Sequence, residues 1–109
     1  AINPDGSAGR YEIVAELPKM VPDGIAFDTA GTLYVACYAP DRIVRVAPDG
    51  TVDLLFDDWS RMALNAPTNL AFAGSDRDRL VVASLGGAGV MVADIGVRGL
   101  PLPTPDLGA

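Results

Sequence analysis

Residues 22–27, Pro-Asp-Gly-Ile-Ala-Phe, return in similar form as residues 67–72, Pro-Thr-Asn-Leu-Ala-Phe, about 45 residues later. Two more pairs of segments align downstream, namely 33–36 with 80–83 and 43–46 with 90–93. The later pairs are slightly further apart, which an insertion around residues 75–79 explains. A repeat of about 45 residues that contains four short strands is the period of a β-propeller blade.

The chain is interrupted at short intervals by 12 glycines and 9 prolines, which leaves little room for a helix of ordinary length. Between these interruptions the sequence predicts eight short strands, at residues 11–17, 24–28, 32–38, 42–47, 51–56, 69–73, 79–84 and 90–95. Residues 57–64 could form at most a short helix, and we interpret them as a loop. The expected class is all-β, with antiparallel four-stranded blades.

The end of the chain that precedes the first repeat also matches part of a blade. Pro4-Asp5-Gly6 resembles Pro48-Asp49-Gly50, the expected turn between third and fourth strands. In chain order, the sequence predicts an outer strand of a preceding blade (1–17), one complete blade (18–64), three inner strands of the last blade (65–95) and a C-terminal tail (96–109). The chain therefore covers about two blades in permuted order.

Propellers close with about four to eight blades, so two blades cannot close a ring by themselves. Two explanations stay open at this point. The sequence is the C-terminal portion of a longer propeller, or copies of it assemble, about three of them giving a six-bladed trimer.

The composition excludes several classes of function. The 8 basic residues are outnumbered by 14 acidic ones, and the resulting net charge of −6 argues against a nucleic-acid partner. The sequence has no histidine, which excludes a Ser-His-Asp triad and a histidine-ligated zinc site. Cys37 is the single cysteine and is expected to be a buried, inert thiol. Long apolar runs and a signal-like start are missing, so we expect no membrane partner and a cytoplasmic protein.

The candidate functional residues precede the innermost strand of each repeat, where positions from every blade converge on one mouth of the central channel. Asp23 has this place in the first repeat, and Thr68 with Asn69 in the second. Their oxygen atoms suit an ion of the Ca²⁺ or Mg²⁺ kind. The alternative is that Asp23 is only a turn residue, since Pro-Asp-Gly is a common turn sequence and occurs three times here.

Two loops that link second and third strands, 38–41 and 85–89, should open on the same mouth. Tyr38 begins the first of them. Trp59, Met62 and Leu64 lie outside these loops, and we expect them to cover the edge of the blade rather than to bind a cofactor.

Taken in order, these motifs resemble the C-terminal blades of the regucalcin/gluconolactonase family, also called the senescence marker protein family. The resemblance rests on the order of six segments, 22–28, 31–38, 41–46, 48–50, 65–74 and 96–102. It implies a six-bladed β-propeller with one divalent metal ion, of the Ca²⁺, Zn²⁺ or Mg²⁺ class, at the channel mouth. It also implies a small-molecule substrate, a sugar lactone or related ester, that the protein hydrolyses.

In that family the metal is held by a Glu near the N-terminus, an Asn in a middle blade and an Asp in a Pro-Asp-Gly turn. Only the Asp has a counterpart here, at Asp23, and the other two ligands would lie upstream of Ala1. The resemblance implies that Asp23 is a metal ligand and a catalytic residue. Thr68, Asn69 and Tyr38 are the candidate substrate contacts. The remaining blades would come from a missing N-terminal part or from other copies.

A non-catalytic segment is the competing hypothesis. Propellers serve in many proteins as binding or scaffold modules, so the fold alone does not determine the function. Upstream sequence without the Glu and Asn donors would favour this second hypothesis.

Overall fold

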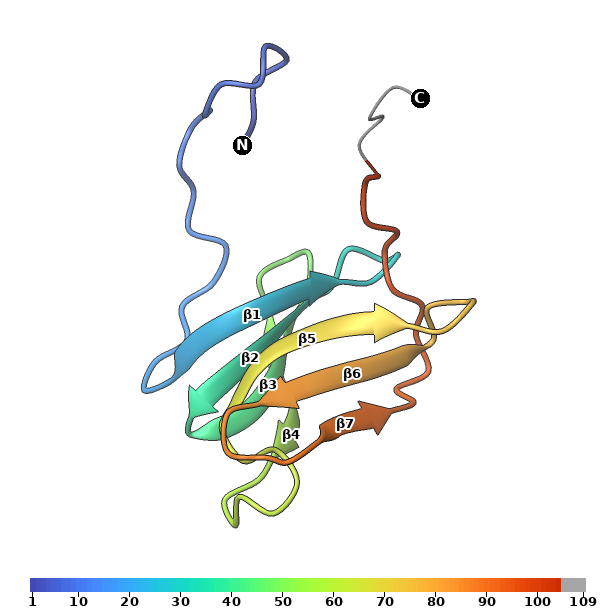
Figure 1. The fold of residues 1–109 in the computed structure, drawn as a ribbon. Coiled ribbons are helices and arrows are strands. Elements are labelled where there is room, and N and C mark those ends of the chain that lie inside the picture. The colour runs from blue at the N-terminus through green and yellow to red at the C-terminus, as the bar shows by residue number, and fades with distance from the viewer. Residues whose placement is uncertain (105–109) are drawn as a thin grey trace.

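A computed structural model describes residues 1–104 and shows seven strands in two antiparallel sheets (Figure 1). The first sheet has the order β1-β2-β3-β4 and the second the order β5-β6-β7. The strands are β1 Val21–Phe27, β2 Leu33–Ala39, β3 Asp41–Val46, β4 Val52–Asp57, β5 Pro67–Ala73, β6 Arg79–Ser84 and β7 Val90–Ala93. The prediction of an all-β class with antiparallel meanders is confirmed.

Short turns with glycine join the strands. Between β3 and β4, the Gly50 amide donates to the Ala47 carbonyl (2.9 Å), and Gly50 has a left-handed φ of 86°. The Asp49 carboxylate accepts a hydrogen bond from the Thr51 amide at 2.9 Å. Glycine reaches this φ without a steric penalty, and Asp at this place stabilises the turn through its own side chain.

The same turn is repeated near the N-terminus. The Gly6 amide donates to the Asn3 carbonyl (2.9 Å), Gly6 has a φ of 83°, and Asp5 accepts from the Ser7 amide at 2.9 Å. The match between the two Pro-Asp-Gly sequences thus extends to their hydrogen bonds.

The strand predicted at residues 11–17 is wrong for this chain, because no ladder forms there. A strand needs a neighbouring strand to satisfy its backbone, and none lies beside this segment. Instead, Ala15, Leu17 and Met20 pack on the outer face of the first sheet. The buried residues that they cover are Val35, Cys37, Val44 and Val46.

The main core lies between the two sheets, where β1, β2 and β3 contact β5 (Figure 1). Tyr34, Ala36 and Ile43 come from the first sheet, and Leu70, Leu80 and Val82 from the second. Leu64 reaches the same core from the loop between β4 and β5 and is only 1% exposed. The even-numbered residues of β2 therefore face the second sheet, as the alternation of a strand requires.

The tail after β7 binds the turn ends of both sheets. Gly99 forms a bridge with Asp28, the Leu100 amide donates to the Phe27 carbonyl, and the Gly99 amide donates to the Arg77 carbonyl, the last two at 2.8 Å. Over residues 1–104, no helix of the kind that could cross a membrane is present.

Candidate functional site

The first strand of each sheet, β1 and β5, begins with a β-bulge. In β1, Pro22 pairs with Cys37 and Ile25 with Val35, so Asp23 and Gly24 together oppose a single residue of β2. In β5, Pro67 pairs with Ser84 and Asn69 with Ala83, which leaves Thr68 as the extra residue. A bulge bends its strand and redirects the side chain at the irregular position, and bulges are common beside active sites.

The two bulges lie against each other. A Cβ atom on Gly24 would be 2.6 Å from Asn69 Cα and 2.7 Å from the Thr68 carbonyl oxygen, so only glycine permits this approach. The structure thus brings the Asp23-Gly24 segment of the first repeat beside the Thr68-Asn69 segment of the second. Their roles in binding remain predictions.

The side chains at this junction differ in their exposure and in their hydrogen bonds. Asp23 and Asn69 are exposed and Thr68 is half-buried. The Asn69 Oδ1 atom accepts a hydrogen bond from the Leu70 amide at 2.9 Å, which leaves the amide nitrogen as the donor that a ligand could use. Asp23 is the single carboxylate of this junction, and the described part of the chain has no group of three or more His, Cys, Asp or Glu side chains that could hold a metal ion.

Tyr38 lies at the same end of the first sheet but in a different cleft. It pairs with Asp41 across the turn from β2 to β3, and its side chain is 39% exposed. The cleft beside it has a volume of about 270 Å³ and is lined by Tyr38, Ala39, Pro40, Asp41, Asp58, Trp59 and Arg61. Tyr38 was predicted to lie at the channel mouth, and no sequence motif indicated this separate cleft.

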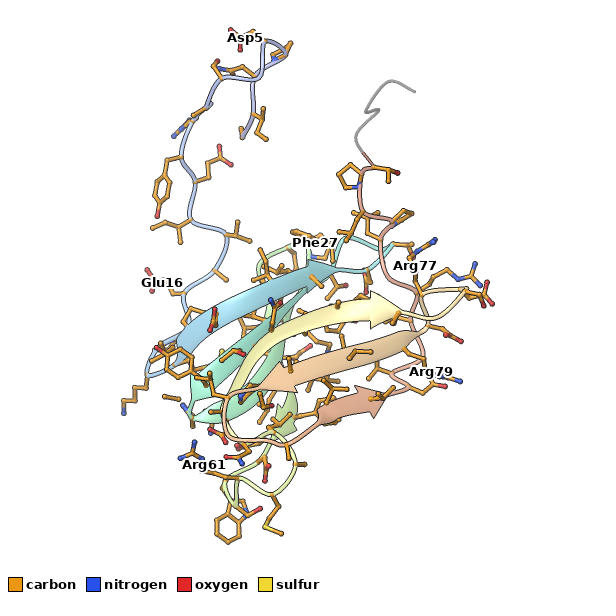
Figure 2. All side chains as sticks on the ribbon, in the orientation of Figure 1. Asp5, Glu16, Phe27, Arg61, Arg77 and Arg79 are labelled. Carbon is orange, nitrogen blue, oxygen red and sulfur yellow. The ribbon has the colours of Figure 1, made fainter. Side chains whose placement is uncertain are left out.

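The other wall of the cleft is the loop of residues 58–66. Here the expectation for Trp59 and Met62 is wrong, since they are 90% and 86% exposed, whereas Leu64 is buried as expected. Figure 2 shows Arg61 on this loop, at the end of the molecule opposite to Phe27 and Arg77.

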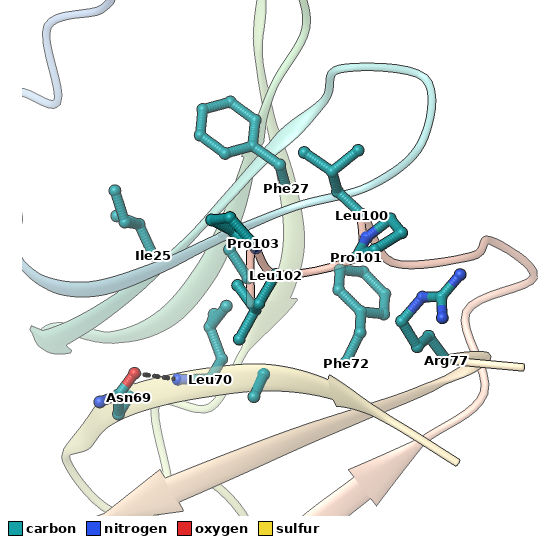
Figure 3. Close-up of a pocket in the computed structure, with 12 residues that line it drawn as sticks. Ile25, Phe27, Asn69, Leu70, Phe72, Arg77, Leu100, Pro101, Leu102 and Pro103 are labelled. Carbon is teal, nitrogen blue, oxygen red and sulfur yellow. Dashed lines mark hydrogen bonds between the residues drawn. The ribbon is translucent and has the colours of Figure 1, made fainter. Parts of the chain in front are cut away.

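A larger cavity, of about 690 Å³, lies between β1 and β5 (Figure 3). Its walls are mostly apolar, with Ile25, Phe27 and Phe72 among them, and Leu100 to Pro103 of the tail lie over it. Asn69 is at one end of this cavity and Arg77 at the other. The sequence contained no signal for it, because the tail is held over the cavity by hydrogen bonds to residues far away in the chain, among them Phe27 and Arg77.

The family model described as SMP-30/Gluconolactonase/LRE-like region matches residues 2–86. Regucalcin of Gallus gallus is 32% identical over 120 aligned positions, which cover 94% of this chain and 38% of that protein. The 6-deoxy-6-sulfogluconolactonase of Pseudomonas putida is 33% identical over 86 positions, covering 76% of this chain and 28% of that protein.

The chain therefore spans between 28% and 38% of the length of these two relatives. The family model covers most of the chain, including the first blade-like sheet and both bulges. On this evidence the chain belongs to the SMP-30/gluconolactonase/LRE-like family.

Proposed function

We propose that this chain forms part of a metal-dependent hydrolase of sugar lactones, in which Asp23 acts at the mouth of a β-propeller channel. The observation that supports this most is the contact of the two bulges, since it brings the segment that carries Asp23 beside the segment that carries Thr68 and Asn69. The lactonase name of the Pseudomonas putida relative supports the substrate class.

A ring of further blades is part of the proposal. The outer face of the second sheet exposes Val90 and Val92 at 60% and 57%, and β7 is an unpaired edge of that sheet. Exposed apolar faces of this kind mark an interaction surface. Further blades, from the same protein or from other copies, would cover it and would close the channel around Asp23.

The residues present fit a divalent ion only in part. A carboxylate is a hard oxygen ligand and suits such an ion, but Ca²⁺ takes about six to eight oxygen atoms. Asp23 would supply one or two of them. The other ligands would come from the blades outside this chain. A bound divalent ion would supply Lewis-acid polarisation of a carbonyl oxygen.

The hydrolysis itself adds water to the lactone. The water oxygen bonds to the carbonyl carbon, the ring C–O bond breaks, and the ring oxygen takes up a proton. Asp23 is the group here that could accept the proton of the attacking water as a general base, if it does not serve the ion. Thr68 and the Asn69 amide would orient the sugar through hydrogen bonds.

The test is calorimetric titration of Ca²⁺, Mg²⁺ and Zn²⁺ into the full-length protein and its Asp23→Asn variant. We expect at least about a tenfold loss of affinity and a matching loss of lactonase kcat, because a charged ligand is removed without a change in size. Asp49→Asn is the matched control. Asp49 has the same Pro-Asp-Gly sequence but lies in the turn between β3 and β4, so this variant should leave both values unchanged.

A non-catalytic scaffold segment is the second candidate, favoured by the single carboxylate at the junction. Unchanged ion affinity in Asp23→Asn would select it over the hydrolase. Such a scaffold segment could also assemble as a trimer, and light scattering tests this. A folded sample with the mass of one chain would exclude the trimer.

A further inference from the structure

The cleft between Tyr38 and Trp59 has the features of a binding site that the Asp23 junction does not explain. It lies at the same end of the first sheet, because Tyr38 stands between Cys37 and Ala39, the β2 partners of Pro22 and Val21. It has a volume of about 270 Å³, and the residues that line it include two aromatic residues, one arginine and two aspartates. Pockets for small molecules combine apolar contact area with a few polar groups in this way.

The wall that holds Trp59 is built by specific bonds. The Asp58 carboxylate accepts hydrogen bonds from the Leu64 and Ala63 amides, both at 2.7 Å, and from Ser60 Oγ at 2.8 Å. The buried Leu64 anchors the far end of the loop in the core. An exposed indole on a loop held in this way is placed for contact with another molecule. Burial of its large ring contributes more to the binding free energy than burial of most other side chains.

Arg61 is fixed in the cleft by a second set of bonds. Its Nε donates to Asp41 Oδ2 at 3.2 Å, and the same oxygen accepts from the Ala66 amide at 2.8 Å. The Asp41 side chain is only 5% exposed, whereas that of Arg61 is 58% exposed. The four N–H groups on the Nη atoms therefore remain on the accessible side as possible donors to a ligand.

The charges of the cleft do not favour an anion. Arg61 is already paired with Asp41. The hydrogen bonds from the Leu64 and Ala63 amides lower the pKa of Asp58 to about 2, so this carboxylate is ionised at neutral pH. The walls thus have one uncompensated negative charge, on a chain whose net charge is −6.

We infer that this cleft binds the neutral ring of a sugar or sugar lactone, with its C–H face on Trp59 and its hydroxyl groups on Tyr38 Oη and the Arg61 guanidinium. A pyranose ring has flat C–H faces that match an indole, and hydroxyl groups that both donate and accept. The inference rests on the proposed function. It adds that this cleft selects the uncharged sugar or lactone over the ionised acid that hydrolysis forms.

Trp59 is the only tryptophan of the chain, so its fluorescence reports on this cleft alone. Titration with methyl β-D-glucopyranoside, a stable neutral ring, and with freshly dissolved glucono-1,5-lactone should quench and blue-shift the emission in a saturable way. Sodium gluconate should act at least about tenfold more weakly, because it adds a negative charge. No response to either neutral compound at high millimolar concentration, or an equal response to gluconate, would overturn the inference.

Variants separate this cleft from other sources of the signal. Tyr38→Phe and Arg61→Gln should each weaken the response to the glucoside by roughly tenfold, since each removes hydrogen-bond donors. Met62→Ala is the matched control, because Met62 is exposed on the same loop but does not line the cleft. If the circular dichroism spectrum shows that Arg61→Gln is unfolded, Tyr38→Phe alone tests the sugar site. The Tyr38 side chain is exposed, so that variant should keep its fold.

Two further results keep this inference distinct from the proposed function. Asp23→Asn should lose ion affinity and keep the response to the glucoside. If the response is lost in Tyr38→Phe while ion binding persists in the parent, the cleft is established whatever the fate of Asp23. An emission that is already blue-shifted without sugar, in a sample that is dimeric by light scattering, would show that a second copy covers Trp59 and would refute the sugar site.

Discussion

A Cβ atom placed on Gly24 would lie 2.5 Å from Asn69 Oδ1, so the first strand of one sheet touches the first strand of the next at the candidate site. Backbone atoms of Thr68 and Asn69 form the other contacts, and backbone cannot move aside as a flexible side chain can. The position of Asp23 relative to Asn69 therefore depends on the absence of a side chain at residue 24.

Gly24→Ala should lower the free energy of unfolding by about 1–3 kcal/mol, because the added methyl group forces the two bulges apart. Urea denaturation measures the loss. Gly89→Ala is the control, since nothing lies within 4 Å of a Cβ at that position, and it should not destabilise the protein. Equal midpoints for the two variants would show that the bulges are not in contact.

Leu64→Ala should cost about 2–5 kcal/mol, because Leu64 is 1% exposed and fills space between both sheets. Met62→Ala, two residues away but 86% exposed, should change stability by less than about 0.5 kcal/mol. Thermal or urea unfolding of both variants checks this pair. Similar losses in both would mean that the loop of residues 58–66 does not anchor in the core.

These features differ in how far the sequence could reveal them. The strand predicted at residues 79–84 coincides with β6, because an apolar run between turn residues depends mainly on local chemistry. The segment at residues 11–17 has the same kind of pattern and forms no strand, since pairing depends on a neighbour that this chain does not place beside it. Local pattern therefore predicts the tendency to form a strand, and topology decides whether one forms.

At the candidate site, too, the local sequence pattern predicts some features, and contacts between distant residues decide the others. Alignment of the two repeats predicted that Asp23 and Thr68, with its neighbour Asn69, hold equivalent places. The structure brings the two segments together. The bulges themselves depend on the register with β2 and β6, which the sequence does not show. The cleft at Trp59 was missed because the bond from Ala66 to Asp41 joins residues far apart in the chain.

Tyr34 should make stability depend on pH in the alkaline range. Tyr34 Oη donates to Asp28 Oδ2 at 3.1 Å. Burial first, and then Asp28, raise the pKa of Tyr34 from 10.0 to about 12. Between these two values the unfolded chain releases a proton that the folded chain keeps, so the contribution is complete below pH 10 and is lost as the pH rises toward 12.

Tyr34→Phe should lack this part of the pH dependence and should cost about 0.5–1.5 kcal/mol at neutral pH through the lost hydrogen bond. Tyr38→Phe is the control, because it removes the same hydroxyl group from a side chain that is 39% exposed. Denaturation midpoints measured from pH 8 to 12 provide the test. Parallel curves for the parent and Tyr34→Phe would contradict the assignment.

The contribution of Asp58 to stability should change with pH in the opposite direction, in the acid range. Its folded pKa of about 2 is below the ordinary value of 3.8, so its contribution is present above pH 3.8 and is lost as the pH falls toward 2. The amide resonances of Leu64 and Ala63 should titrate with a midpoint near pH 2, as followed by NMR. In Asp58→Ala both amides should exchange faster with solvent, whereas Asp53→Ala, an exposed pair with Arg45, should leave them protected.

The reactivity of Cys37 reports on how residues 15–20 pack against the outer face of the first sheet, the face away from the second sheet. The thiol is fully buried in the cluster of Val35, Val44 and Val46, and burial raises its pKa, so the reactive thiolate is scarce at neutral pH. We expect a disulfide reagent such as DTNB to label the native chain only at the rate of unfolding, and to label it at once in urea. Leu17→Ala should speed the native reaction, because Leu17 packs on this cluster, whereas Ile13→Ala, whose side chain is 67% exposed, should not. Rapid labelling of the unmodified native chain would show that residues 15–20 do not cover this face.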